Sequence, residues 1–262
     1  MFLFKKKLLL CLLTLGLCTP APAVQADEIE TRRAVEKVLR EKPELVLDIL
    51  RNNSEVVLEI AQQGSNSRRR RNLEAQWQED IKTKKDVRVE GRPVMGPKNA
   101  KVAIVAFSDF TCHYCEAASS TLESLFKVYG DDMSLVFKSL PSDEKGSSML
   151  ASKYFLAIGL QDESKAWSFY KRMFAKREQL AGKGGVDFIK KTVQELGLDV
   201  RKVGRDAESR KVLDLIREDQ EDADKFGVEG TPYFLVNNLV LRGALPLDLF
   251  TLAVETAKKT GK

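Results

Sequence analysis

Two cysteines separated by two residues are the most informative chemical feature of this sequence. Cys112-His113-Tyr114-Cys115 follows an apolar run and opens a stretch with a helical pattern. The N-terminus of a helix carries partial positive charge, which favours the thiolate form of a cysteine placed there. The spacing also lets the second thiol reach back and close a disulfide. We therefore predict that Cys112 is the exposed attacking thiol, that Cys115 is the buried resolving thiol, and that His113 adds charge that favours the thiolate.

Other uses of a cysteine pair fit less well. A structural zinc site takes four ligands, and the chain has a single histidine beside this pair, so we expect no metal site. A purely structural disulfide with so tight a loop would constrain the unfolded chain little. Binding of Cu(I) stays open, because soft thiolates suit that ion.

The segments around the pair predict a mixed α/β domain. A buried strand over residues 101–107 precedes the cysteines, and a helix over residues 116–129 follows them. The remaining expected elements are a strand at 133–140, several helices between 146 and 226, strands at 233–236 and 239–242 joined by Asn237-Asn238, and a final helix from about Pro246. The predicted fold class is therefore α/β, with a helical insertion over about residues 142–226.

Residues 1–26 have the three parts of a secretory signal peptide. Lys5 to Lys7 form a basic start, residues 8–17 are almost entirely apolar, and small residues with prolines follow. The apolar run is too short to span a bilayer, which takes roughly 20 residues. We expect cleavage after Ala23 or Ala26 and a periplasmic protein.

The exported chain is nearly neutral. The full chain has 43 basic and 38 acidic side chains, and its formal net charge of +5 falls to +2 because residues 1–26 take three lysines and no acidic residue with them. So small a net charge does not indicate binding to nucleic acid. Arg68 to Arg71 form a local basic run without interleaved aromatic residues, which we interpret as a solvated face. The same cleavage removes two of the four cysteines, and the pair described above remains.

Residues 27–63 are predicted to form short helices with a small internal repeat. Residues 43–49 (PELVLDI) match residues 54–60 (SEVVLEI), and each copy is apolar on nearly all sides. A short helix with such a surface must be buried by something. We expect residues 27–63 to form a self-association arm; packing against the chain's own domain is the alternative.

A linker is predicted between this arm and the main domain. Gly64 to Ser67 have linker composition, and the four arginines after them repel one another. Leu73, Trp77 and Ile81 then recur at four-residue spacing, which indicates an amphipathic helix. We place the arm and linker at residues 27–86 and the main domain at residues 87–262.

The two landmarks of the main domain resemble the DsbA-like thioredoxin-fold family of thiol:disulfide oxidoreductases. Residues 103–115 (AIVAFSDFTCHYC) are similar to that family's active-site strand and helix start, and residues 227–234 (GVEGTPYF) are similar to its cis-proline loop. The resemblance covers about residues 88–262 and implies a thioredoxin fold with a helical insertion. It also implies that Thr231 and Pro232 lie beside the cysteines and that they bind a substrate polypeptide together with Tyr114.

Within this family, the helical arm and Thr231 are similar to the oligomeric isomerases of the ScsC-like and DsbC-like branch. His113 departs from the glycine or proline found at this place in the branch with tyrosine before the second cysteine. Ala106 stands where many relatives have a buried glutamate that assists proton transfer at the resolving thiol. Asp109 is predicted to form local hydrogen bonds and not to replace that glutamate.

The resemblance implies an exported enzyme that exchanges disulfides in unfolded or misoxidised secreted proteins. We expect chiefly a disulfide isomerase or reductase, with a membrane-bound thiol redox partner and homo-oligomers formed through residues 27–63. We expect no cofactor beyond the redox-active Cys112–Cys115 disulfide and no nucleic-acid partner. A DsbA-like dithiol oxidase, a copper-binding thiol protein and a chaperone-like binder are the alternatives.

Overall fold

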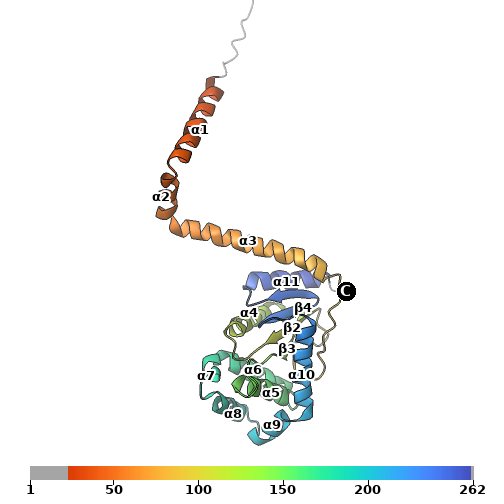
Figure 1. The fold of residues 1–262 in the computed structure, drawn as a ribbon. Coiled ribbons are helices and arrows are strands. Elements are labelled where there is room, and N and C mark those ends of the chain that lie inside the picture. Colours follow the sequence, from red (N-terminus) through yellow and green to blue (C-terminus); the bar gives the residue numbers. More distant parts are fainter. Residues whose placement is uncertain (1–22, 261–262) are drawn as a thin grey trace, which may run out of the picture. The chain divides into compact units, whose positions relative to one another are not determined.

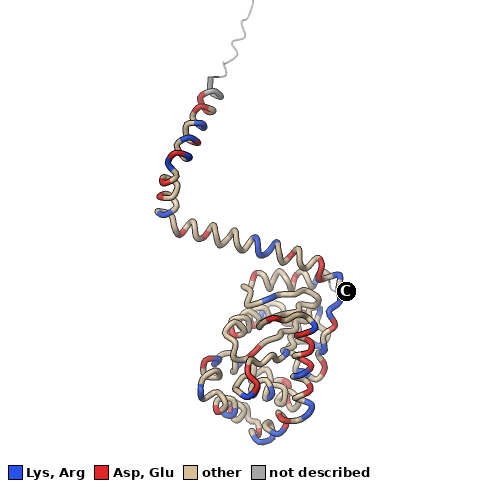
Figure 2. The backbone as a smooth tube through the Cα atoms, viewed as in Figure 1, with Lys and Arg blue, Asp and Glu red and all other residues tan. Residues whose placement is uncertain are grey.

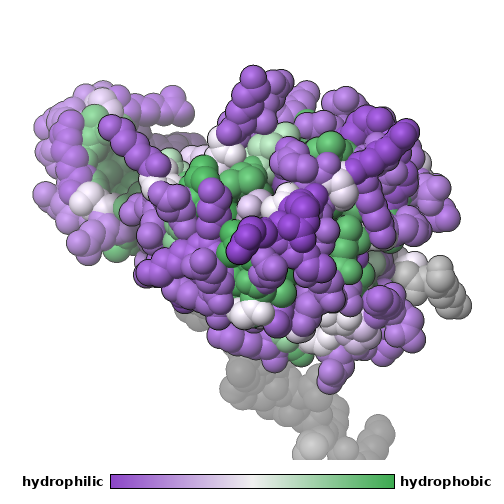
Figure 3. Space-filling view, turned by 90° about the horizontal axis from the view of Figure 1, so that it is seen from below, coloured by the Kyte–Doolittle hydropathy of each residue, from purple (hydrophilic) through white to green (hydrophobic). Residues whose placement is uncertain are grey.

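The computed structural model describes residues 23–260, which divide between two compact units, Met1–Asn66 and Ser67–Lys262 (Figure 1). Residues 1–22 of the predicted signal peptide lie outside the described range, so its cleavage stays a prediction. No helix within residues 23–260 is both long and apolar enough to cross a bilayer. On the face drawn in Figure 3, hydrophilic side chains predominate and hydrophobic ones form separate patches.

The first unit is helical, as predicted. It contains α1 (Ala23–Glu41), α2 (Glu44–Asn52) and the start of α3 (Ser54–Asp80). Asn53 separates α2 from α3, and its side-chain amide donates a hydrogen bond of 2.8 Å to the carbonyl of Ile49. The apolar side chains of the repeat are exposed; they include Leu45, Val46, Leu47, Ile49, Leu50, Val56, Leu58 and Ile60. A helical arm is therefore present, and its own unit leaves its apolar surface uncovered.

The predicted linker at Gly64 to Ser67 is wrong, because α3 runs through it without a break. A glycine inside a helix costs about 1 kcal/mol relative to alanine, and serine and asparagine cost less. Good helix formers flank the segment on both sides, and propagation of an existing helix costs much less than nucleation of a new one. Hydrogen bonds between side chains four residues apart support both flanks, from Gln63 to Glu59 and from Arg70 to Glu74. The arginine run therefore forms a basic band within α3 (Figure 2).

A five-stranded mixed sheet lies at the centre of the second unit, in the order β1-β3-β2-β4-β5. The strands are β1 (Val94–Met95), β2 (Val102–Ser108), β3 (Met133–Ser139), β4 (Tyr233–Val236) and β5 (Leu239–Arg242). β2 and β3 are parallel, and the other neighbouring pairs are antiparallel. The four strands predicted from the sequence are confirmed, whereas the two-residue edge strand β1 was not predicted.

Helices cover both faces of this sheet. Ile104 and Ala106 of β2 belong to the main core, with α4 (His113–Tyr129), α11 (Leu247–Thr260) and the helical insertion. Val105 and Phe107 belong to a smaller core on the other face, closed by the end of α10 and the segment before β1. β2 therefore carries apolar side chains in both directions, as a strand covered on both faces does.

The helical insertion is confirmed and packs beneath the loop that carries the cysteines. Its helices are α5 (Ser147–Gly159), α6 (Glu163–Ala175), α7 (Arg177–Ala181), α8 (Gly185–Glu195), α9 (Val200–Ala207) and α10 (Arg210–Lys225). Phe110, two residues before Cys112, stacks on Phe137 of β3 with ring centroids 4.6 Å apart. It also contacts the rings of Phe155 and Phe169 edge-on. The insertion thus fixes the start of the active-site helix through an aromatic core.

The C-terminal part of α3 packs against the edge strand β5, so the predicted amphipathic helix is confirmed. The buried indole of Trp77 donates a hydrogen bond of 3.0 Å to the carbonyl of Val240, and Gln76 donates one of 3.1 Å to the same oxygen. Asp80 accepts a hydrogen bond of 3.0 Å from the amide of Val240. These bonds satisfy backbone groups that an edge strand would otherwise present to solvent.

A buried ion cluster joins α10 to the sheet. The ammonium group of Lys138 on β3 is fully buried and lies 2.5 Å from Asp222 and 3.1 Å from Asp219. Arg92 lies 2.6 Å from Asp219, and Arg88 lies 2.8 Å from Asp222. Buried charges are tolerated when paired in this way, and the cluster fixes α10 across the sheet.

Candidate active site

The loop between β2 and α4 is held by Asp109. Its buried carboxylate accepts hydrogen bonds from the amide of Thr111 at 2.8 Å, the hydroxyl of Ser148 at 2.6 Å and the amide of Ser142 at 3.1 Å. Its carbonyl accepts one from the amide of Cys112 at 3.2 Å. The predicted local hydrogen-bonding role of Asp109 is confirmed, and the effect is to fix the backbone of Cys112.

Cys112 is the residue that precedes the first turn of α4. Its backbone is extended, with φ −72° and ψ 126°, and its carbonyl accepts the hydrogen bond from the amide of Glu116. Its half-buried thiol donates a weak hydrogen bond of 3.7 Å to the carbonyl of Thr231. The sulfur therefore stands at the positive end of the helix, beside the backbone of a second loop.

Cys115 lies one turn further along α4 and is 1% exposed. Burial raises the pKa of its thiol to about 12, although hydrogen bonds with the backbone of Asp109 and the side chains of Ser108 and Thr231 oppose the shift. Both cysteines are thiols in this structure. At neutral pH the thiol of Cys115 is therefore protonated while the pair is reduced.

The second loop contains the cis Thr231–Pro232 bond that the resemblance implied. The carbonyl of Pro232 accepts a hydrogen bond of 2.8 Å from the amide of Gly243, and β4 begins at Tyr233. The antiparallel pairing of Phe107 with Tyr233 aligns the start of β4 with the end of β2. The topology thus places the Thr231 backbone next to the cysteine pair.

His113 and Tyr114 project from the first turn of α4. Tyr114 is 64% exposed, and its ring lies edge-on to that of His113 at 5.7 Å. His113 Nδ1 lies 3.6 Å from the carboxylate of Glu116, which also accepts a hydrogen bond of 2.8 Å from Arg177. The polar tip of His113 therefore faces an acidic group on its own helix, and an effect of His113 on Cys112 stays a prediction.

A groove of about 520 Å³ begins beside Tyr114 and Thr231. One side is formed by Arg69, Leu73 and Gln76 of α3. The other is formed by Arg242 at the end of β5 and by residues 243–245 after it. The sequence predicted an amphipathic helix around Leu73 but not that this helix lines a groove beside Tyr114, because periodicity does not identify the surface that a helix faces.

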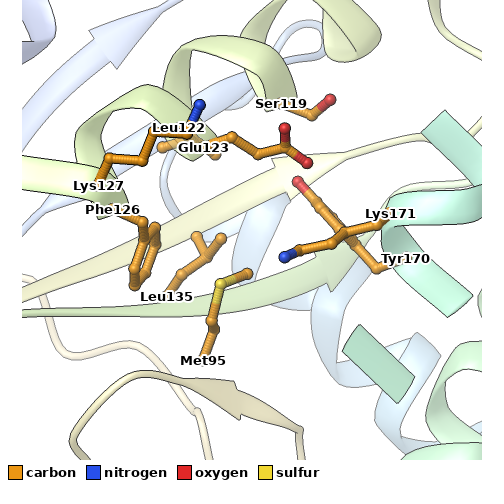
Figure 4. A pocket seen from close by; sticks show the side chains of 9 residues that line it. All are labelled: Met95, Ser119, Leu122, Glu123, Phe126, Lys127, Leu135, Tyr170 and Lys171. Carbon is orange, nitrogen blue, oxygen red and sulfur yellow. The ribbon is translucent and has the colours of Figure 1, made fainter. Parts of the chain in front are cut away.

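A separate cavity of about 240 Å³ lies along α4 and is lined by residues of that helix from Ser119 to Lys127 (Figure 4). Tyr170 of α6 lines it, and in Figure 4 the Tyr170 hydroxyl and the Glu123 carboxylate point toward one another. Burial raises the pKa of Tyr170, and the nearby Cys115 and Glu123 raise it further. Ala106, which is 1% exposed, offers no acidic group to Cys115. Tyr170 is therefore a polar group near the buried Cys115 thiol that the sequence did not reveal.

Within residues 23–260, no three or more histidine, cysteine, aspartate or glutamate side chains gather into a group that could hold a metal ion. The Cys112–Cys115 pair lies next to Tyr114 and Thr231, which line the groove, and it has one half-buried and one buried sulfur. The chemistry this arrangement offers is attack by one thiol followed by intramolecular displacement by the other.

The family model described as Thioredoxin matches residues 88–256. A periplasmic thioredoxin-like protein from Salmonella enterica serovar Typhimurium is 25% identical, with a TM-score of 0.56 over 64% of this chain and 91% of that chain. A thioredoxin-like oxidoreductase from Silicibacter pomeroyi is 26% identical, with a TM-score of 0.58 over 65% of this chain and 94% of that chain.

The fold of Proteus mirabilis ScsC extends over more of the chain. Its structure in a transitional conformation covers 90% of this chain and 98% of that chain, with 21% identity and a TM-score of 0.56. At that identity the likeness is one of fold.

Curated relatives of similar sequence are much longer proteins. The Na⁺/H⁺ antiporter NhaA from Herminiimonas arsenicoxydans is 28% identical over 169 residues, which are 63% of this chain and 25% of the antiporter. The chain thus spans about a quarter of the length of the curated relatives it matches. The transport activity in that name is a property of those longer proteins.

Proposed function

Because this chain belongs to the thioredoxin family, we propose that it is an exported thiol:disulfide oxidoreductase that acts through Cys112 and Cys115. The observation that carries the proposal is the position of the Cys112 sulfur. It lies at the N-terminus of α4, 3.7 Å from the carbonyl of Thr231, a residue that lines a groove, and a second thiol is buried one turn behind it.

In the first step, the Cys112 thiolate attacks one sulfur of a substrate disulfide. The substrate S–S bond breaks, a Cys112–substrate disulfide forms, and the other substrate sulfur leaves as a thiolate that takes up a proton. The backbone of Thr231 lies beside this bond, and its amide and carbonyl groups can form hydrogen bonds with a polypeptide segment.

Two routes resolve the mixed disulfide. Attack by a free thiol of the substrate on its own sulfur releases Cys112 and leaves the substrate isomerised, with no net change of oxidation state. Attack by Cys115 on the Cys112 sulfur closes the Cys112–Cys115 disulfide and releases a substrate thiol, so that the substrate is reduced and the enzyme is oxidised. The reverse of the second route oxidises a substrate dithiol. A thiol redox partner then restores the working state.

Isomerisation is the route we favour, and the arm supports it. Its apolar residues are exposed in a single chain; Ile49 and Ile60 are 61% and 62% exposed. Burying one such side chain contributes about 1.5–3 kcal/mol, so several of them stabilise an assembly of copies. We propose that residues 27–63 join copies of this chain, which holds several Cys112 sites around one misoxidised client.

Reactivation of scrambled ribonuclease by protein starting at Asp27, in glutathione buffer, tests this function. We expect recovery of ribonuclease activity with the natural chain and none above buffer with Cys112→Ser. Rapid oxidation of reduced ribonuclease without reactivation of the scrambled form would assign the protein to the dithiol oxidases. Inertness in both assays would overturn the proposal.

A further inference from the structure

We propose that the groove beside Cys112 selects polypeptides that carry an acidic side chain within a few residues of the reacting cysteine. The inference rests on the proposed thiol–disulfide exchange and adds its substrate preference. It is carried by Arg69 and Arg242, which line the groove together.

The wall formed by α3 is fixed to the domain. Gln76 and Trp77 bond to the carbonyl of Val240, and Asp80 accepts from its amide. Arg69, Leu73 and Gln76 lie on one face of α3, at successive turns. Because the C-terminal end of this helix is anchored, Arg69 is held beside the groove. Arg69 is thereby a residue of the active-site surface, although it lies 43 positions before Cys112.

Arg242 is oriented from the opposite wall. Its guanidinium donates a hydrogen bond of 3.2 Å to the side-chain oxygen of Gln76 and lies 5.6 Å from the centre of the Tyr233 ring. Both contacts leave its positive charge uncompensated. Arg69 is exposed, and within residues 23–260 neither arginine has a carboxylate within 4.0 Å.

Nearby acidic groups do not neutralise the groove. The residues that line it include two arginines and no aspartate or glutamate. Glu74 is paired with Arg70, and Asp80 is paired with Lys85. Glu229 lines a neighbouring depression, which shares Thr231 and Arg242 with the groove. The electrostatic potential in the groove is therefore positive on the side formed by α3.

Apolar groups complete the surface. Leu73, Ala244 and Leu245 line the same groove as the two arginines. A cysteine-containing segment with one acidic and one apolar neighbour matches this chemistry, because the arginines attract its carboxylate while Leu73, Ala244 and Leu245 offer apolar contacts to its other side chain. A segment with a lysine in the same place meets like charge.

Three blocked heptapeptides test the preference. Each carries a central cysteine as a mixed disulfide with thionitrobenzoate and differs only in having glutamate, glutamine or lysine on both sides. Attack by the Cys112 thiolate transfers the peptide to Cys112 and releases thionitrobenzoate, whose absorbance gives the rate. We expect the glutamate peptide to react faster than the glutamine peptide by about two- to fivefold for each arginine engaged, and the lysine peptide to react slowest. Added salt should reduce these ratios.

Charge reversal provides the decisive comparison. Arg69→Glu should reverse the order, so that the lysine peptide reacts faster than the glutamate peptide, and Arg242→Gln should reduce the preference. Arg68→Glu is the matched control, because it makes the same change of charge one position away and outside the groove; it should leave the order unchanged. Circular dichroism checks that each variant keeps its helices.

Equal rates for the three peptides on the natural chain would overturn the inference and leave the proposed function in place. An equal effect of Arg68→Glu and Arg69→Glu would also overturn it, because the preference would then reflect net charge. Failure of all three peptides to react would overturn the proposed function together with the inference.

Discussion

At the scale of residues, the two cysteines have the same chemistry and opposite surroundings. Cys112 occupies the N-cap position of α4 and is half-buried, whereas Cys115 is 1% exposed. Burial raises the pKa of the Cys115 thiol to about 12. We therefore expect the Cys112 thiol to react with a large substrate. We expect the Cys115 thiol to react only with the neighbouring Cys112 sulfur.

Alkylation of the reduced protein tests this difference. At about pH 6 we expect iodoacetamide to modify Cys112 and to leave Cys115 unmodified, because the Cys115 thiol is buried and protonated far below its pKa. Peptide mass spectrometry of the digested protein gives the extent of modification at each position. Denatured protein is the control, in which both should label equally. Equal labelling of the native protein would contradict the assignment of roles.

The residues of the cysteine pair were predictable because their signal is local. The buried strand and the helix that starts after it are adjacent in sequence, and together they determine the positions of both thiols. Tyr170, Arg69 and Arg242 could not be found in this way, because each reaches the site through packing between distant segments.

At the scale of elements, the contact between α3 and β5 connects residues 163 positions apart. The sequence indicated the buried face of the helix through Leu73, Trp77 and Ile81. It did not indicate which surface that face covers, since periodicity carries no information about the partner. The helix also continues through Gly64, where local composition favoured a linker and propagation prevailed.

A pair of tryptophan substitutions tests the anchoring of α3. Trp77 and Trp167 are both buried; the Trp77 indole donates to Val240, whereas the Trp167 indole has no hydrogen-bond partner within the described part of the chain. Both substitutions to phenylalanine remove a similar volume. We expect Trp77→Phe to lower the free energy of unfolding by about 1 kcal/mol more than Trp167→Phe. Urea denaturation measures both, and equal losses would show that the hydrogen bond does not anchor the helix.

The buried ion cluster makes a stronger prediction. Lys138→Met leaves Asp219 and Asp222 without their shared cation, and we expect the free energy of unfolding to fall by about 3–5 kcal/mol. Lys191→Met is the control, because Lys191 makes an exposed pair with Glu195, and it should change stability by less than about 0.5 kcal/mol. Similar values for the two variants in urea denaturation would show that the cluster does not hold α10.

Acid should weaken the contacts that Asp222 makes in this cluster. Burial alone would raise the pKa of Asp222, but hydrogen bonds from Lys138 and Arg88 outweigh it and lower that pKa. A carboxyl group whose pKa is lower in the folded chain stabilises the fold above its ordinary value of about 4, and this contribution is lost as pH falls through the folded value. We therefore expect Asp222→Asn to lose less stability than the natural chain between about pH 5 and pH 3. A larger loss of stability in Asp222→Asn than in the natural chain over this pH range would contradict the predicted direction of the effect.

At the scale of the whole molecule, the chain combines a thioredoxin-family domain with helices whose apolar side chains are exposed. Both parts were predictable in outline: the domain from its two motifs, and the arm from a repeat that is apolar nearly all round. The boundary between them was not, because α3 continues from one unit into the other.

Removal of residues 27–66 tests the role of the arm. The deletion ends at the unit boundary and keeps the part of α3 that packs on β5. We expect a folded monomer by light scattering, with thiol exchange toward small peptides retained and reactivation of scrambled ribonuclease lost. Ile60→Lys in the full mature chain, which places a charge in the apolar surface, should weaken the assembly in the same direction. An oligomer that persists after the deletion would show that another surface joins the copies.

Trapping of the mixed disulfide tests the central claim most directly. Cys115→Ser keeps the attacking thiol and removes the resolving one, so after reaction with a scrambled client its intact mass should show one covalently bound client per chain, mapped to Cys112 by digestion. Cys112→Ser, treated in the same way, should show no adduct. Absence of an adduct in Cys115→Ser, or an adduct of similar yield on Cys115 in Cys112→Ser, would contradict the proposed division of labour between the two thiols.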